Sequence, residues 1–151
     1  MNLKNILVVI LTCFNAATFA QKAETTKANI TLVSAFSNKI PENAQTNPPK
    51  TGEFFIVKWN ESSYPESVFW RGQGGWLSCN IEKAVKKGKK YVGAPVEIEK
   101  IKKGQLLMFS PVTGGRFPIP AEIPENAKNT IFYKTAGSAW KSFPVKKISK
   151  K

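Results

Sequence analysis

The chain has 151 residues and a formal net charge of +13, contains no histidine, and carries glutamate at all ten acidic positions, so it lacks aspartate as well. Without an imidazole there is no histidine base for a Ser or Cys nucleophile and no histidine-containing zinc site, and without Asp the usual calcium loops, aspartic dyads and magnesium sites lose their standard ligands. The composition therefore excludes most hydrolase and metalloenzyme designs, and we expect a protein without catalysis, without a metal and without a cofactor.

A secretory signal peptide is the first predicted element, at residues 1–20. Lys4 precedes an apolar run, and small residues then provide a cleavage site after Ala20, in the order that such peptides show. The run is shorter than the roughly 20 apolar residues that span a bilayer, and no later segment reaches that length, so we expect no transmembrane segment. The protein should be exported, to a periplasmic, cell-surface or extracellular location. As an alternative, Cys13 would carry a lipid, although Thr12 is bulkier than the residue that usually precedes an acylated cysteine.

A single domain is expected after the signal peptide. Removing 20 of the 151 residues leaves 131, and a chain of that size forms one core that buries about two-thirds of its unfolded surface. We assign residues 21–27 to a flexible N-terminal segment, 28–148 to the domain and 149–151 to a basic tail. Cys79 is then the only cysteine, which excludes an intrachain disulfide.

Short strands rich in aromatic and β-branched residues make up the domain, and no long segment has a helical apolar period. Residues 37–52 contain three prolines and many turn formers, which indicates a long connection. Strands separated by such turn signals favour an antiparallel β-sandwich, immunoglobulin-like as the first choice, with a small β-barrel as the alternative. The expected strands are 28–36, 54–59, 67–71, 75–82, 91–99, 105–111, 130–135 and 139–148.

The stretch VFWRGQGGWLSC, residues 68–79, predicts a hairpin with a two-residue turn at Gln73 and Gly74. This turn places Arg71 opposite Trp76, and alternation separates a core face from an outer face. Arg71 and Trp76 fall on the outer face, where they are candidate ligand-binding residues. The same pair is also common as cation–π packing between strands, without a ligand. The predicted core face holds Val68, Trp70, Leu77, Cys79 and Ile81.

Lysine dominates the basic residues, with 21 Lys against two Arg. Base-specific readers of nucleic acid depend on Arg, so we expect no specific nucleic-acid partner. Lysine clusters in an exported protein instead suit an anionic polysaccharide or another polyanion, although a Lys-biased solvated surface has the same composition. The run over 83–90 contains Gly88 and predicts a protruding β-turn that presents several ammonium groups together. The candidate ligand-binding residues there are Lys86, Lys87, Lys89 and Lys90.

These observations give one leading hypothesis and two alternatives, and they indicate no oligomeric state. The leading hypothesis is an exported, non-catalytic binding or interaction module that docks on an anionic envelope or extracellular surface, or on a protein partner. The first alternative is a carbohydrate-binding module that stacks neutral glycans on Trp76 and neighbouring aromatic rings. The second, more distant one is a glycan hydrolase, which would use Glu97 and Glu99 about 7 Å apart on one face of a strand, near the carboxyl spacing of glycosidases.

Overall fold

The computed structural model describes residues 26–41, 49–113, 119–124 and 126–150, and it confirms the all-β class. One 3₁₀ turn, η1 at Ile98–Lys100, is the only helical element in these ranges. No helix in the described part of the chain is long and apolar enough to cross a bilayer. The strands are Thr26–Lys27 (β1), Ile30–Ser37 (β2), Glu53–Trp59 (β3), Pro65–Gly72 (β4), Gly75–Lys87 (β5), Lys90–Ala94 (β6), Leu106–Pro111 (β7), Thr130–Thr135 (β8), Lys141–Pro144 (β9) and Ser149–Lys150 (β10).

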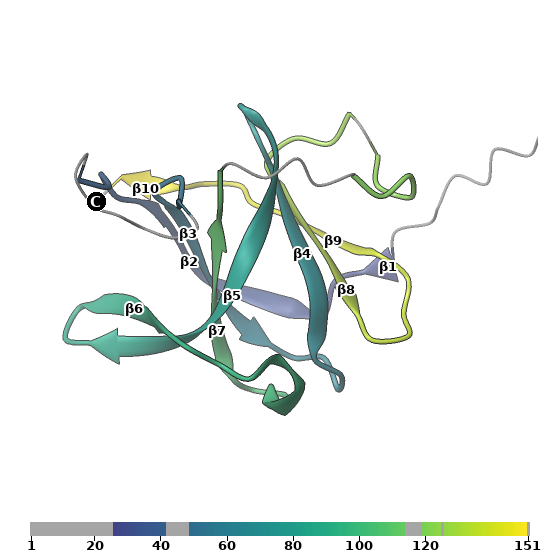
Figure 1. The fold of residues 1–151 in the computed structure, drawn as a ribbon, viewed down its shortest axis with the longest axis horizontal. Coiled ribbons are helices and arrows are strands. Elements are labelled where there is room, and N and C mark those ends of the chain that lie inside the picture. The colour runs from purple at the N-terminus through teal and green to yellow at the C-terminus, as the bar shows by residue number, and fades with distance from the viewer. Residues whose placement is uncertain (1–25, 42–48, 114–118, 125, 151) are drawn as a thin grey trace, which may run out of the picture.

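These strands form one continuous sheet that curls into a half-barrel (Figure 1). Along the sheet the order is β1-β9-β8-β4-β5-β7-β3-β2-β10, and β6 pairs with β5 beside this path. Most neighbours are antiparallel, but β1 with β9 and β2 with β10 run parallel. The antiparallel, immunoglobulin-like sandwich is therefore not confirmed, and the curled sheet is closer to the small barrel that was the alternative.

The length of β5 explains why there is one sheet. Its first part, up to Ser78, pairs with β4, whereas residues 79–83 pair with β7. The same strand therefore belongs to both halves, while the two layers of a sandwich pack face to face as separate sheets. Beyond the pairing with β7, the strand continues to Lys87 and forms a hairpin with β6, which projects at the lower left of Figure 1.

The first and last described segments of the chain pair with each other at both ends of the sheet. The first described segment, which contains β1 and β2, runs beside the last one, which contains β9 and β10: Thr26 pairs with Lys141, and Phe36 pairs with Ser149. Pairing of this kind leaves fewer open strand edges, which are sites of unwanted association. Since β1 and β10 lie outside residues 28–148, the sheet extends into both flanking segments of the expected domain.

The main core fills the inside of the curl. Alternation along β3 sends Phe55, Val57 and Trp59 inward, where they are fully buried, and sends Ile56 to the outer face. The ring of Trp70, from β4, lies against Phe55 with 4.6 Å between the ring centroids. Burial of side chains of this size stabilises the fold by about 1.5–3 kcal/mol each.

Prolines shorten two of the expected strands, and those parts of the prediction are wrong. Instead of continuing to residue 99, β6 stops at Ala94, because Pro95 has no N–H to extend the ladder. Likewise, the strand expected over 139–148 ends at Pro144, and pairing resumes only in β10. The hydrophobic pattern alone overestimates strand length where a proline lies inside it.

Candidate functional site

The hairpin predicted at residues 68–79 forms with the predicted register, so Arg71 lies opposite Trp76. The glycine that adopts a positive φ is Gly75, at 127°, and not Gly74. A side chain rarely tolerates such a φ, whereas glycine does. The two-residue turn is therefore confirmed, but Gly75 supplies the conformational freedom that the turn requires.

Arg71 and Trp76 contact each other and also the protein around them. The guanidinium carbon of Arg71 lies 5.6 Å from the Trp76 ring centroid, and Arg71 Nε donates a 3.2 Å hydrogen bond to the carbonyl oxygen of Ala127. The Trp76 ring also lies 5.3 Å from that of Phe132. These contacts place Trp76, which is half-buried, in a small side cluster. The side cluster consists of Ile123, Phe132 and Trp140 with Phe69, Trp76 and Ala127.

The other face of this hairpin points into the main core, as predicted. Burial, and then the nearby Glu53 carboxylate, raise the pKa of the Cys79 thiol. A nucleophilic cysteine needs the opposite shift, so Cys79 acts as a core residue. The main core contains or directly contacts all five predicted residues, Val68, Trp70, Leu77, Cys79 and Ile81.

The lysine turn, which we define as Lys86, Lys87, Lys89 and Lys90, joins β5 to β6. Gly88 has a φ of 60°, and Lys87 lies directly opposite Lys90 across the turn. All four side chains are exposed, and within the described ranges none of them forms an ion pair. Because like charges in directly opposed positions repel, the pairing of Lys87 with Lys90 is unfavourable for the hairpin.

An apolar groove lies beside the lysine turn, between β6 and the segment that follows β2. It has a volume of about 350 Å³, and its floor includes Phe36 and Phe54, whose rings stack with centroids 5.5 Å apart. The apolar lining consists mainly of Phe36, Ile40, Phe54, Tyr91, Val92 and Met108. The sequence analysis missed this groove, because its side chains come from several strands and one connection.

A second hollow joins the groove to the lysine turn. Its volume is about 630 Å³, and it is lined by Asn38, Lys39, Lys89 and Lys90. Asn38 and Lys39 also line the apolar groove. A basic hollow and an apolar groove therefore adjoin, with Lys39 at the boundary between them.

Gly93, in the wall of the groove, allows two side chains to approach the backbone closely. A Cβ at this position would lie 2.4 Å from Met108 Cε and 2.6 Å from Glu82 Cδ, which is too close for either. Glu82 in turn accepts hydrogen bonds from Lys50 Nζ at 3.0 Å and from Ser110 Oγ at 3.1 Å. This carboxylate is thus already compensated by Lys50, and it does not neutralise the lysines of the adjoining hollow.

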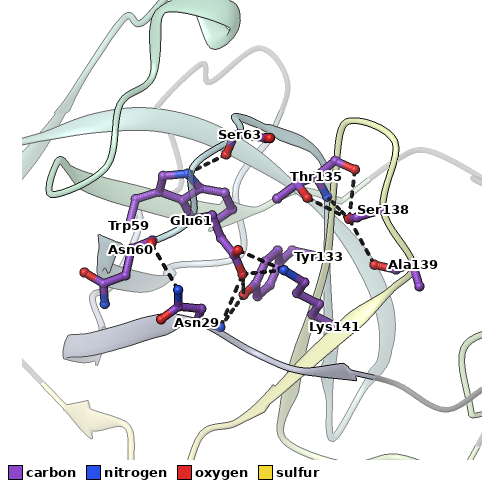
Figure 2. A network of polar contacts seen from close by, with 10 residues as sticks. All are labelled: Asn29, Trp59, Asn60, Glu61, Ser63, Tyr133, Thr135, Ser138, Ala139 and Lys141. Atoms are coloured by element: carbon purple, nitrogen blue, oxygen red, sulfur yellow. Dashed lines mark hydrogen bonds and ion pairs between the residues drawn. The ribbon is translucent and has the colours of Figure 1, made fainter.

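A polar network that the sequence analysis missed joins two strands and two connections of the chain (Figure 2). Both carboxylate oxygens of Glu61 accept 2.8 Å hydrogen bonds from Lys141 Nζ, and Tyr133 donates a 2.6 Å hydrogen bond to Glu61 Oε1. The backbone N–H of Asn29, at the bend between β1 and β2, donates to the Tyr133 hydroxyl at 2.8 Å. The network therefore attaches this bend to β8 and β9.

The electrostatics of the network indicate a structural role. Burial raises the pKa of Glu61, but the hydrogen bonds from Lys141 and Tyr133 outweigh it, so the pKa lies below its ordinary value. Burial and the hydrogen bond to Glu61 raise the pKa of Tyr133. Among the described residues, no buried side-chain nitrogen or oxygen lacks a hydrogen-bond partner, so no buried polar atom of the network is left unpaired.

Glu97 and Glu99 do not share a strand face, which corrects the geometry on which the hydrolase alternative depended. Glu97 precedes η1 and Glu99 lies within it. Glu97 also forms a 2.7 Å ion pair with Lys100, and both of these side chains are 72% exposed. Glu97 and Glu99 therefore lie exposed on a short turn and do not face each other across a cleft.

Comparison with known protein families, characterised proteins and solved structures finds no match to this chain.

Proposed function

We propose that the protein is an exported, non-catalytic binding module that docks on an anionic surface of the cell envelope or its surroundings through the lysine turn. The observation that carries this proposal is the exposed cluster of four lysines, in which Lys87 directly opposes Lys90. The four ammonium groups attract an anion that binds there, and the bound anion also reduces the repulsion between Lys87 and Lys90. Export depends on the signal peptide expected at residues 1–20, which lie outside the described residues.

Lys39 extends the basic surface to a second segment of the chain. It follows β2, yet it lines the same hollow as Lys89 and Lys90. The ammonium group is a compact charge without the planar fork of arginine, so it suits anionic groups in varied orientations rather than one fixed base or carboxylate. Lysines from two separate segments thus support binding to a surface that carries repeated anionic groups.

The salt dependence of binding to dextran sulfate, a soluble polyanion, tests the proposal. Each lysine that binds the polyanion releases counterions, so affinity should fall log-linearly with salt concentration, by analogy with nucleic acids. Changing Lys86, Lys87, Lys89 and Lys90 to Gln should reduce the slope of log affinity against log salt by roughly one for each of these lysines that binds the polyanion in the wild type. Titrations at several salt concentrations measure both slopes.

A charge-matched variant separates a site from general charge. Lys102, Lys103, Lys146 and Lys147 lie outside the lysine turn and are largely accessible, so changing these four to Gln removes the same charge and should leave most of the slope. Equal flattening in both variants would show a non-specific basic surface and contradict the proposal. Salt-insensitive binding to a neutral glycan that is lost in Trp76→Ala would instead assign the function to the carbohydrate-binding alternative.

A further inference from the structure

We propose that the anionic surface is a lipid bilayer: the lysine turn and Lys39 bind the headgroup of an anionic lipid, and the apolar groove accepts one of its acyl chains. This inference rests on the proposed function, because it names the ligand of the same surface. The carrying observation is that the basic hollow and the apolar groove share Asn38 and Lys39. The apolar and the cationic hollow therefore adjoin, so one amphipathic ligand could contact both.

The apolar half distinguishes a lipid from a polysaccharide. A sulfated or phosphorylated polysaccharide would use the lysines but would leave the groove filled with water. At about 350 Å³, the groove lies within the range of about 300–1,000 Å³ that is typical of ligand pockets. An acyl chain there would remove water from Ile40, Phe54 and Tyr91, and such burial is favourable in proportion to the apolar area removed.

The placement of Lys86 and Tyr91 also fits a bilayer surface. Lys86 pairs with Tyr91 across the hairpin, and because side chains alternate along β5, Lys86 shares a face with the buried Ala84 beside the groove. A lysine stem can lie along an apolar surface while its ammonium group reaches a headgroup phosphate. Tyrosine rings are likewise enriched where the apolar layer meets water.

Binding to vesicles tests the inference with matched variants. Vesicles of phosphatidylcholine alone and of phosphatidylcholine mixed with phosphatidylglycerol are incubated with the protein and sedimented. Wild type should bind the mixed vesicles and not the neutral ones. Ile40→Gln places a polar group in the groove and should weaken this binding roughly tenfold, whereas Val33→Gln, at an exposed valine of β2, should change it by less than about twofold.

Soluble dextran sulfate separates failure of this inference from failure of the proposed function. Ile40→Gln should bind dextran sulfate as wild type does, because the lysines are intact. If it also binds the mixed vesicles as tightly as wild type, the groove takes no acyl chain, and the lipid inference is overturned while the docking proposal stands. If wild type binds neither dextran sulfate nor mixed vesicles, both fail.

A second groove variant guards against misfolding of the first. Tyr91→Gln changes the opposite wall of the groove, on β6, and should give a similar loss of vesicle binding. Thermal unfolding checks that this variant is folded, and vesicle binding equal to wild type in a folded Tyr91→Gln variant would also overturn the inference.

Discussion

Whether a side chain in this protein is buried or exposed depends on the face of the strand on which it lies, and Cys79 provides a direct test. Cys79 is half-buried, and its thiol packs against the main core, so we expect modification to depend largely on local or global opening. We expect a thiol reagent to label the native protein at least about a hundredfold more slowly than the protein in denaturant. The control is Val33→Cys in a Cys79→Ala background, which should label rapidly because Val33 is 45% exposed. Rapid labelling of native Cys79 would mean that the register is shifted by one residue.

The alternation of apolar and polar side chains explains why the core residues of β4 and β5 could be predicted from the sequence. This signal spans only a few residues, so it could not predict the pairing of Glu61 with Lys141. Apolar side chains at every second position around Trp70 and Cys79 form a pattern that is visible within a few residues. Glu61 and Lys141, in contrast, are 80 positions apart, and each occurs in an ordinary polar context. No local signal distinguishes such a pair from solvated charges, because only the tertiary fold brings the two segments together.

At the scale of elements, the hairpin of β5 and β6 depends on the conformation of Gly88. Its φ is 60°, and a Cβ added there would contact nothing within 4 Å, so a substitution meets backbone strain but no clash. Gly88→Val should therefore lower the free energy of unfolding by about 1–2 kcal/mol, whereas Gly88→Asn should be better tolerated. Denaturant titration measures both. Equal stability of the two variants would contradict the left-handed turn.

The element boundaries show which physical effects the sequence reveals. The turn at Gly88 was predicted, since a glycine within a charged run between two apolar segments is a strong signal. The strand before it extends to Lys87 rather than stopping at residue 82, because pairing with β6 and β7 compensates for its charged composition. The groove beside it was not predictable, since its lining depends on how far β6 lies from the segment after β2.

At the scale of the whole molecule, the first and last described segments run side by side, and the network around Glu61 connects them. Removing its carboxylate leaves Lys141, only 16% exposed in its side chain, without a counter-charge. Glu61→Gln should therefore lower the free energy of unfolding at neutral pH by about 3 kcal/mol. Glu66→Gln is the matched control. Glu66 forms a 4.0 Å ion pair with Lys134, and the two side chains are 51% and 39% exposed, respectively. Loss of this exposed pair should lower the free energy of unfolding by less than about 1 kcal/mol.

The pH dependence of this difference identifies its electrostatic origin. The folded-state pKa of Glu61 lies below its ordinary value of 4.5, so the ionised carboxylate contributes stability that is fully present above that value and is lost as pH falls through the folded-state pKa. Wild type should consequently approach Glu61→Gln in stability as the pH is lowered below about 4.5, because its own carboxylate becomes protonated. Denaturant titrations from neutral to acidic pH measure the gap between the two proteins. A gap that stays constant into acid would show that Glu61 acts through its shape and packing, and the connection between the first and last described segments would then not depend on the charge pair.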